Sequence, residues 1–348
     1  MLDRSLDSRS RIASLTFAAV IAIASTSCAS GGATPATSAG HATPQRTASQ
    51  RNAPTTRPRR DSTAARRPAA APAGMDVLKD RDSTSMAIDV SDGFAFLTGA
   101  ATGRPGVFMF DTGSPDLFML NRHVVPLDSA TRSGQVTTPF GKTVDAYVNK
   151  KIGQILLRTV VYPNVGDVRS ADLETIDEKV RPDFLGLIGF PLIKDVAFKL
   201  DYDHRRLTLF QLDSAGAPKL STVSPSSVLG VLHFTTSKAN TPEVTFAVGG
   251  TQLPATFDTG TRGSLTLTDA TRKALETAGV LHVAKDSVTL DHATADSVSF
   301  SIPVASVTTG AANHLAIGTR FFERHPTVWN FHARTLTVLR GAEGAAAK

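Results

Sequence analysis

The feature that most constrains how this chain can fold is an internal duplication. An apolar run at residues 106–110, GVFMF, leads directly into Asp-Thr-Gly-Ser at residues 111–114. The same order recurs 147 residues later, where residues 253–257, LPATF, lead into Asp-Thr-Gly-Thr at residues 258–261. A single Asp-Thr-Gly is an ordinary turn after a strand. Two copies in the same context instead indicate two related halves.

A second match extends the duplication toward the end of each half. Residues 187–210 align with residues 316–339 at a spacing of 129, and each segment begins with two apolar residues and a glycine. The two spacings differ by 18 residues, and we place the difference in the polar stretch at residues 164–183, which has no counterpart in the second half. Each half thus contains a strand, Asp-Thr-Gly, further strands, apolar-apolar-Gly and a closing strand pair.

Short β-branched runs separated by Gly, Asp, Asn and Pro extend from about Met75 onward, a pattern typical of an all-β protein. Helical periodicity is scarce. The best helix candidates are residues 172–180 and residues 268–279, of which the second starts at a Thr or Asp cap and ends at a glycine. Trp329 and Phe331 fall in a closing strand, where we expect both to belong to the core.

The paired aspartates, Asp111 and Asp258, indicate acid–base chemistry. A carboxylate at the end of an apolar strand is costly to bury alone, because desolvation disfavours its charged form. Two carboxylates brought together can share one proton. The ionised partner can then take a proton from water while the protonated partner donates to the carbonyl oxygen under attack. This chemistry needs neither a metal nor a covalent intermediate.

The two residues after each aspartate fit the same use. We expect Gly113 and Gly260 to let the backbone turn sharply and approach the carboxylates closely. We expect the hydroxyls of Thr112 and Thr259 to form hydrogen bonds with the opposite half and so to fix the geometry.

Ser114 and Thr261 occupy the next position in each copy. Their hydroxyls can donate hydrogen bonds to the aspartates, which would favour the ionised form. We therefore expect low working pKa values for the pair and an activity that favours acidic pH.

With these motifs the chain resembles the pepsin and retropepsin-like aspartic proteases, as a bacterial member with both half-sites on one polypeptide. The resemblance covers about residues 75–340. It implies an all-β, bilobal, pepsin-like architecture built from two retropepsin-like halves, each of which supplies one aspartate to an active-site cleft between the lobes. The apolar-apolar-Gly segments at residues 187–189 and 316–318 would pack beside the aspartate loops.

The resemblance also implies an activity, the endopeptidase hydrolysis of peptide bonds by water activated between the two aspartates. The substrate would be a peptide or protein, no cofactor is implied, and one chain with both half-sites would act as a monomer. A β-hairpin flap is implied around residues 135–148, with Phe140-Gly141 as its tip. Pepsin-like enzymes carry a tyrosine on the flap, and the nearest one here is Tyr147.

A competing interpretation is an envelope protein that keeps the cleft and holds a peptide or glycan without cleaving it. A pure binder does not need two adjacent carboxylates, so the duplicated aspartates favour hydrolysis. A scavenging enzyme and a processing protease for one envelope partner would carry the same motifs. The nine histidines lack metal-ligand spacing, and we expect no metal site.

The basic charge of the chain is confined to its beginning. The formal net charge is +6, but residues 1–82 hold 12 Lys and Arg against 6 Asp and Glu, which leaves 25 of each sign in the rest. The folded part is therefore neutral. This distribution argues against a nucleic-acid partner.

The first 28 residues are typical of an export signal, because basic residues precede a short apolar run at residues 12–24. Cys28, the single cysteine, follows small residues, so the leader resembles a bacterial lipoprotein signal that would anchor the chain to a membrane through a lipid on Cys28. An ordinary cleavage site at residues 22–24 is the alternative. Both routes predict export to the periplasm or cell envelope.

The remaining boundaries follow from composition. Residues 29–74 are rich in Ala, Ser, Thr, Pro and Arg and poor in large apolar side chains, which predicts a disordered tether. We place the N-terminal lobe at residues 75–220, the C-terminal lobe at residues 221–340 and a disordered tail at residues 341–348.

Overall fold

The computed structural model describes residues 73–341, except residues 128–129, 139–141, 151, 164, 166, 238–239 and 286. The leader, Cys28 and the expected flap tip at Phe140-Gly141 therefore lie outside the described residues. Helix α1 (Ala73–Leu78) opens the described part, so the expected tether boundary at residue 74 falls inside a helix. No helix in the described part of the chain is long and apolar enough to cross a membrane.

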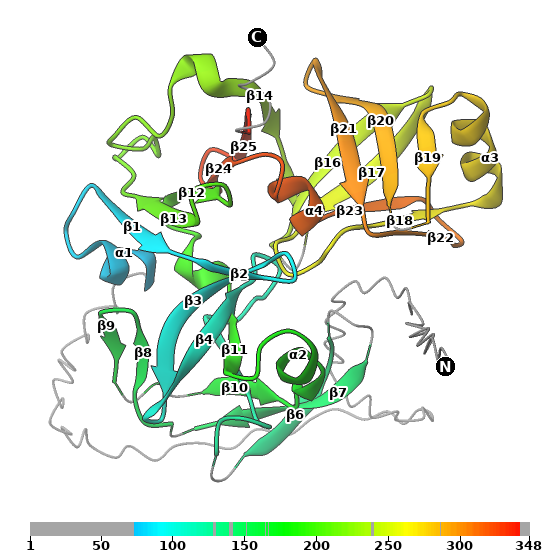
Figure 1. The fold of residues 1–348 in the computed structure, drawn as a ribbon. Coiled ribbons are helices and arrows are strands. Elements are labelled where there is room, and N and C mark those ends of the chain that lie inside the picture. The colour runs from blue at the N-terminus through cyan, green and yellow to red at the C-terminus, as the bar shows by residue number, and fades with distance from the viewer. Residues whose placement is uncertain are drawn as a thin grey trace, which may run out of the picture. The chain divides into compact units, whose positions relative to one another are not determined.

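The first lobe is built on one ten-stranded sheet (Figure 1). Its strands are β2 (Asp89–Ser91), β3 (Phe94–Ala101), β4 (Arg104–Phe110), β5 (Phe118–Asn121), β6 (Thr131–Thr137), β7 (Thr143–Asn149), β8 (Ile155–Leu157), β9 (Val160–Tyr162), β10 (Val168–Ala171) and β11 (Phe184–Ile188). Nine of them lie in the order β6-β7-β10-β5-β11-β4-β3-β8-β9, and β2 pairs with β3. Helix α2 (Glu174–Lys179) connects β10 to β11 and falls within the predicted segment at residues 172–180.

The second lobe is built on a nine-stranded sheet. Its strands are β15 (Thr235–Thr236), β16 (Pro242–Val248), β17 (Thr251–Phe257), β18 (Ser264–Leu267), β19 (Leu281–Val283), β20 (Val288–Ala295), β21 (Val298–Val304), β22 (Ser306–Thr309) and β23 (His314–Ile317). Seven of them lie in the order β19-β20-β16-β17-β23-β18-β22, while β15 pairs with β16 and β21 with β20. Helix α4 (Thr319–Phe322) follows β23.

Helix α3 (Asp269–Thr277) confirms the second helix prediction. The Thr268 hydroxyl oxygen accepts a hydrogen bond from the Thr271 N–H and so caps the helix. The helix ends before Gly279, which has a positive φ of 66°.

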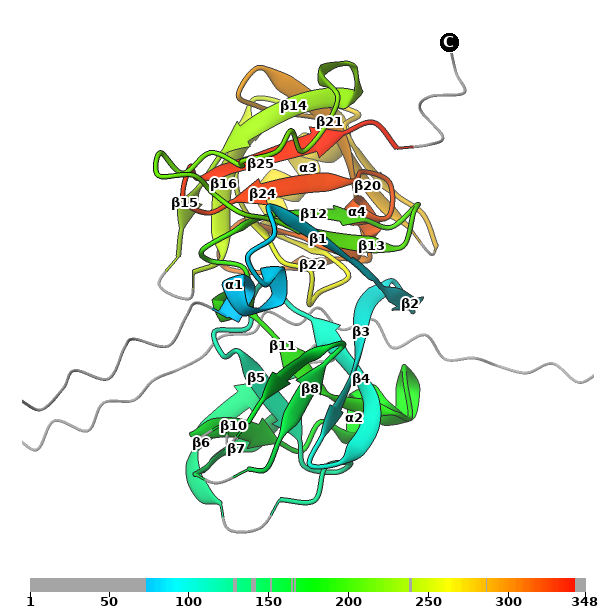
Figure 2. The ribbon, with the colours of Figure 1, turned by 90° about the vertical axis from the view of Figure 1, so that its left-hand side faces the viewer.

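A third sheet, of six strands, combines the closing segments of both halves (Figure 2). In order across this shared sheet, the strands are β1 (Ser83–Ala87), β13 (Arg206–Phe210), β12 (Ala197–Asp201), β24 (Thr327–Asn330), β25 (Thr335–Leu339) and β14 (Val228–His233). The central pair, β12 and β24, is antiparallel, with Phe198 opposite Trp329. Two short 3₁₀ helices, η1 (Phe190–Leu192) and η2 (Pro225–Ser227), complete the chain. Trp329 and Phe331 are buried, as predicted.

The two lobes repeat one strand arrangement. In the first lobe β11 lies between β4 and β5, parallel to β4 and antiparallel to β5. In the second lobe β23 lies in the same way between β17 and β18. These topologies confirm the predicted all-β, two-lobed fold class, with matching halves as the resemblance to pepsin-like proteins implies.

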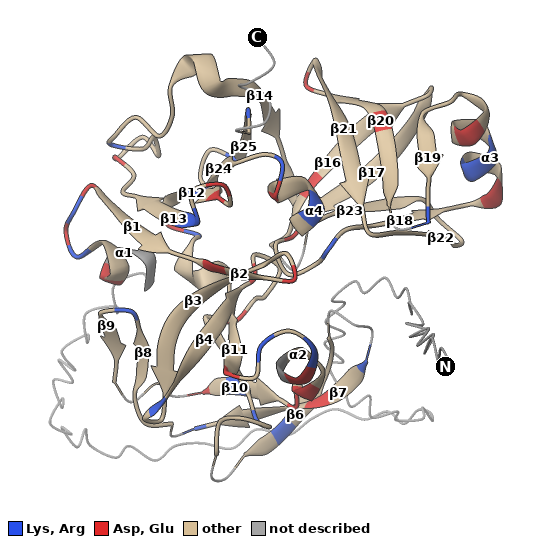
Figure 3. Cartoon of the chain, viewed as in Figure 1, with Lys and Arg blue, Asp and Glu red and all other residues tan. Residues whose placement is uncertain are grey.

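Acidic and basic residues are interspersed over both lobes (Figure 3). One large apolar cluster extends through the shared sheet and both lobes. A smaller second cluster lies in the first lobe alone and includes Phe94, Met109, Ile176 and Leu187.

Candidate active site

The two Asp-Thr-Gly segments begin at equivalent strand ends. Asp111 directly follows β4, and its N–H donates to the Ile188 carbonyl at 2.9 Å. Asp258 directly follows β17, and its N–H donates to the Ile317 carbonyl at 3.0 Å. Each aspartate is therefore fixed to the last residue of the strand inserted beside it.

Aromatic residues of the shared sheet lie beneath both aspartate loops. Phe110, which precedes Asp111, packs edge-on against Phe198 with ring centroids 5.5 Å apart. Phe257, which precedes the other aspartate, packs edge-on against Trp329 at 6.2 Å. Phe198 and Trp329 stack on each other at 5.4 Å, so one aromatic cluster supports both loops.

Each carboxyl group lies against the glycine of the opposite loop. A Cβ atom added to Gly113 would lie 2.7 Å from Oδ2 of Asp258. One added to Gly260 would lie 2.5 Å from Cγ of Asp111. Any side chain at either position would displace the opposite carboxyl group, which is the physical reason for a glycine there.

One backbone N–H lies between the two carboxyl groups. The Gly113 N–H donates to Oδ1 of Asp111 at 2.9 Å and to Oδ1 of Asp258 at 3.2 Å. The Ser114 N–H adds a second bond to Asp111 at 3.1 Å, and the Gly260 N–H adds one to Asp258 at 2.8 Å. The structure thus brings Asp111 and Asp258, from separate lobes, to one place.

The two threonines link the loops reciprocally. The Thr112 N–H donates to Oγ1 of Thr259, and the Thr259 N–H donates to Oγ1 of Thr112, both at 3.0 Å. The Thr259 hydroxyl also donates to the Phe110 carbonyl at 2.9 Å. Both threonines are fully buried, and their hydrogen bonds cross between the halves in the expected way.

The hydroxyls of Ser114 and Thr261 do not take the positions that the sequence suggests. Oγ of Ser114 is buried and has no hydrogen-bond partner among the described residues, and only its backbone N–H reaches an aspartate. Oγ1 of Thr261 accepts from the Gly263 N–H at 3.3 Å. Backbone N–H groups, rather than these hydroxyls, therefore bind the carboxyl groups.

The electrostatic environment also differs from the sequence expectation of low pKa values. Burial raises the pKa of Asp111 well above its usual value, and the adjacent charge of Asp258 raises it further, against the lowering effect of the backbone N–H bonds. Burial also raises the pKa of Asp258, which is partly exposed, whereas Asp111 is fully buried. The pair therefore retains a proton at pH values where an isolated aspartate has lost it.

The apolar-apolar-Gly segments contact the aspartate loops. Gly189 lies against the Ser114 carbonyl, and Gly318 lies against the Thr261 carbonyl, each so closely that no Cβ would fit. The Phe190 N–H donates to the Ser114 carbonyl at 2.8 Å, and the Thr319 N–H donates to the Thr261 carbonyl at 2.8 Å.

The segment expected to form the flap is a β-hairpin. Strands β6 and β7 pair with Thr137 opposite Thr143, and the Thr138 N–H donates to the Lys142 carbonyl at 2.8 Å. Tyr147 lies on β7, where the guanidinium of Arg122 stacks 4.0 Å from its ring centroid.

Sequence reasoning missed two ion pairs beside the aspartate loops. Asp116 pairs with Arg169 of β10 at 3.2 Å, next to the first loop. Arg262, next to the second loop, pairs with Asp92 of the β2–β3 turn. The duplication contained a signal for Arg262, because this position holds a proline, Pro115, in the first copy. In the described ranges, no group of three or more His, Cys, Asp and Glu side chains is placed to hold a metal ion.

No model of a protein family and no curated protein matches the sequence. Among solved structures, the chain is similar to basic 7S globulin from soybean, with a TM-score of 0.48 and 10% identity over 77% of this chain and 97% of that one. It is also similar to an aspartic proteinase from Irpex lacteus, with a TM-score of 0.46 and 11% identity over 76% of this chain and 99% of that one. At identities of 10% and 11%, neither similarity is evidence of a shared activity. The fold is defined by the chain's own strand topology.

Proposed function

We propose that this chain is an aspartic endopeptidase that hydrolyses peptide bonds with water activated between Asp111 and Asp258. One observation carries the proposal: two carboxyl groups from two lobes meet around the Gly113 N–H, which donates to both of them. A structural turn would need only one such aspartate. Two carboxyl groups at hydrogen-bond reach of one donor, one of them fully buried, are costly unless they share a proton.

The unequal environments support different roles for the two aspartates. Asp111 holds the shared proton, because it is fully buried and because burial and the adjacent charge of Asp258 both raise its pKa. Asp258 is ionised and partly exposed, so it can receive a proton from an approaching water molecule.

Hydrolysis then proceeds in two steps. The water oxygen bonds to the peptide carbonyl carbon as Asp258 takes the water proton and Asp111 gives its proton to the carbonyl oxygen. In the second step the C–N bond breaks, the nitrogen takes the proton from Asp258, and a hydroxyl proton of the intermediate returns to Asp111. The reciprocal Thr112–Thr259 hydrogen bonds hold the two loops in register through both steps.

The first experiment compares the purified protein with its Asp111→Asn variant on a mixed peptide library between pH 3 and pH 8. Cleavage by the wild type that is lost in the variant and blocked by a statine-type transition-state analogue would support the proposal. A folded wild type that binds peptides but cleaves none at any pH would contradict it and favour the non-hydrolytic peptide- or glycan-binding protein.

We further propose that the chain is exported and that Cys28 carries a lipid, on the strength of the leader sequence alone. Cys28→Ala should release the protein from the membrane fraction of the producing cells. Unchanged fractionation would contradict lipid anchoring.

A further inference from the structure

The turn between β2 and β3 in the first lobe contacts the second aspartate loop. The carboxylate of Asp92, in this turn, forms an ion pair with the guanidinium of Arg262. The next residue, Gly93, has a φ of +82° and packs against α4, such that an added Cβ would lie 2.8 Å from Oγ1 of Thr319. In Figure 1 the turn that follows β2 lies below α4, in agreement with the close approach of Gly93 to Thr319.

Arg262 lies beside the second aspartate loop and contacts the first lobe. It is the fourth residue after Asp258, and its guanidinium lies 5.9 Å from the ring centroid of Phe94. Phe94 belongs to the second apolar cluster, together with Met109, two residues before Asp111. Arg262 is thus four residues from Asp258 and in contact with the first lobe, so we expect a polypeptide that lies across both aspartates to pass near it.

The charged groups at this contact are accessible. The side chain of Arg262 is 37% exposed and that of Asp92 is 40% exposed. Nε of Arg262 is buried without a hydrogen-bond partner among the residues that the structure describes, so it is not the group that a ligand would reach. The guanidinium presents five N–H groups in a fork that matches a carboxylate, and the ion pair with Asp92 engages only part of them, so the exposed part of the side chain can receive a second carboxylate.

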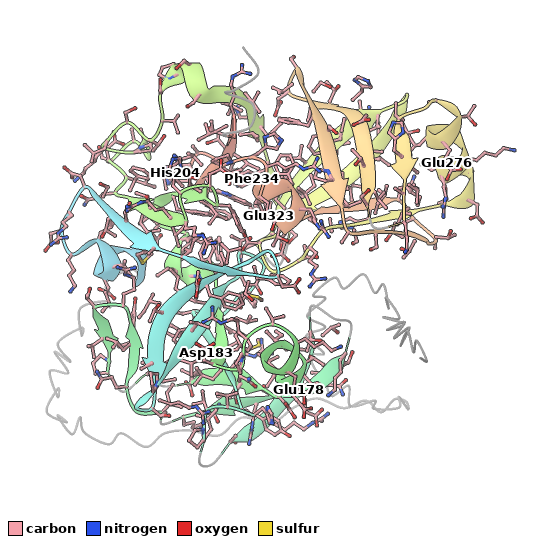
Figure 4. The ribbon with its side chains drawn as sticks, viewed as in Figure 1. Glu178, Asp183, His204, Phe234, Glu276 and Glu323 are labelled. Atoms are coloured by element: carbon pink, nitrogen blue, oxygen red, sulfur yellow. The ribbon has the colours of Figure 1, made fainter. Side chains whose placement is uncertain are left out.

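Two further charges face Arg262 from α4 and the residue after it. Burial lowers the pKa of Arg262, the positive charge of Arg320 lowers it further, and the negative charge of Glu323 raises it. Glu323, labelled in Figure 4, lies beside the β2–β3 turn, because a Cβ added to Gly93 would lie 3.2 Å from its Oε1. Arginine stays protonated in proteins, so a positive charge persists at this position.

We propose that Arg262 is a specificity-determining residue that favours a carboxylate side chain in the substrate, at one position on the side of the scissile bond that passes the β2–β3 turn. The inference rests on the proposed function, because it requires a peptide across both aspartates. In the free protein the carboxylate of Asp92 is paired with the guanidinium of Arg262. A substrate carboxylate competes with Asp92 for it, so the two residues have opposite effects on selectivity.

The test uses pairs of peptides that differ only by Glu or Gln at each position around a bond that the protein cleaves. Cleavage is measured as kcat/KM with the wild type and with the Arg262→Gln, Arg262→Lys and Asp92→Asn variants. Binding of the same peptides is measured in the Asp111→Asn background, where they stay intact, with and without each change. Circular dichroism checks that each variant is folded.

At one position the wild type should prefer Glu over Gln. Arg262→Gln should reduce this preference by roughly two- to fivefold, the range of a partly exposed charge pair, whereas Arg262→Lys should retain most of it. Asp92→Asn should increase the preference, because the competing carboxylate is gone. Equal Glu-to-Gln ratios in the wild type and Arg262→Gln at every position would overturn the inference, as would a reduced preference in Asp92→Asn.

The binding measurements separate this inference from the proposed function. An Arg262-dependent preference in binding without any cleavage by the wild type would contradict the endopeptidase and support the role of Arg262. Cleavage with no Arg262-dependent preference in either measurement would support the endopeptidase and refute the role of Arg262.

Discussion

The first lobe buries both faces of its central strands, whereas the second lobe buries mainly one face. The last four residues of β4 are all buried, with Phe108 in the large cluster and Met109 in the second. Along β17, burial alternates, and Gln252 and Pro254 are exposed. The extra cover in the first lobe comes from α2 and the β6–β7 hairpin, which contribute Ile176 and Val136 to the second cluster.

Despite this difference, five consecutive strands of one sheet correspond to five of the other. The order β10-β5-β11-β4-β3 in the first lobe matches β22-β18-β23-β17-β16 in the second, and the hairpin continues the first sheet beyond β10. The common core positions the aspartates alike at the ends of β4 and β17. Of these equivalent carboxyl groups, Asp111 is fully buried and Asp258 is partly exposed, a difference that suits the separate acid and base roles proposed above.

The largest expected effect is on the two aspartates. Asp111→Asn and Asp258→Asn should each reduce kcat by roughly 10³-fold or more, because either change leaves one step without its proton donor or acceptor. Peptide cleavage assays measure this, and circular dichroism checks folding. If only one of the two changes were harmful, the lobes would not contribute equally and the shared mechanism would fail.

The next largest effect is on the paired glycines. Gly113→Ala and Gly260→Ala should each lower activity by about 10²-fold, because the new methyl group displaces the opposite carboxyl group by a fraction of an ångström or more. Gly153→Ala is the matched control, since nothing lies within 4 Å of its Cβ position. A Gly260→Ala variant with wild-type activity would show that the close contact between Gly260 and the carboxyl group of Asp111 is dispensable.

The pH dependence should distinguish the two aspartates. Activity should fall as pH rises through the raised pKa of Asp111, by about tenfold per pH unit beyond it, because the proton donor is lost. Stability should also fall with rising pH between the usual value of 3.8 and that raised pKa, because the folded state keeps a proton that the unfolded state has released.

Urea denaturation at a series of pH values tests this pH dependence. Asp111→Asn should remove more of the decrease in stability than Asp258→Asn, because Asp111 is fully buried whereas Asp258 is partly exposed. Wild-type stability that instead rises over this window would mean that the aspartates ionise more easily in the folded protein than in the unfolded chain.

The smallest expected effect is the loss of protein stability when either Thr112 or Thr259 is replaced. Thr259→Val should cost about 2–3 kcal/mol of unfolding free energy and Thr112→Val about 1–2 kcal/mol, because the Thr259 hydroxyl both accepts from Thr112 and donates to the Phe110 carbonyl. Urea denaturation at neutral pH measures both. Equal costs would indicate that the extra hydrogen bond contributes nothing.

The positions of the aspartates were predictable because they follow from local order repeated at a fixed spacing. The same repeat, at residues 187–210 and 316–339, predicted a closing strand pair in each half, which the structure shows as β12 with β13 and β24 with β25. Residues 164–183, assigned no counterpart, include β10, which occupies the sheet position of β22 in the second lobe. The sequence does not show that β10 and β22 are equivalent, because the two strands differ in residue type and in the lengths of the segments that connect them to their neighbours.

Contacts of residues outside the repeated motif were not predictable. The Asp92–Arg262 ion pair joins segments far apart in the chain, and neither residue lies in a periodic pattern that marks it. Likewise, Ser114 and Thr261 are hydroxyl residues of the expected type, but the backbone turns present N–H groups to the carboxylates first. Local composition does not determine which of two available donors reaches an acceptor.

The register of the shared sheet has a consequence for how such a chain could arise. Lys199 lies opposite Val328, and these two residues are equivalents in the duplication. An ancestral homodimer of first halves in the same register would place Lys199 against its own symmetry mate, where like charges repel. Fusion into one polypeptide allows the mates to diverge. One side keeps a lysine that binds Asp201 at 2.9 Å, and the other side carries a buried valine.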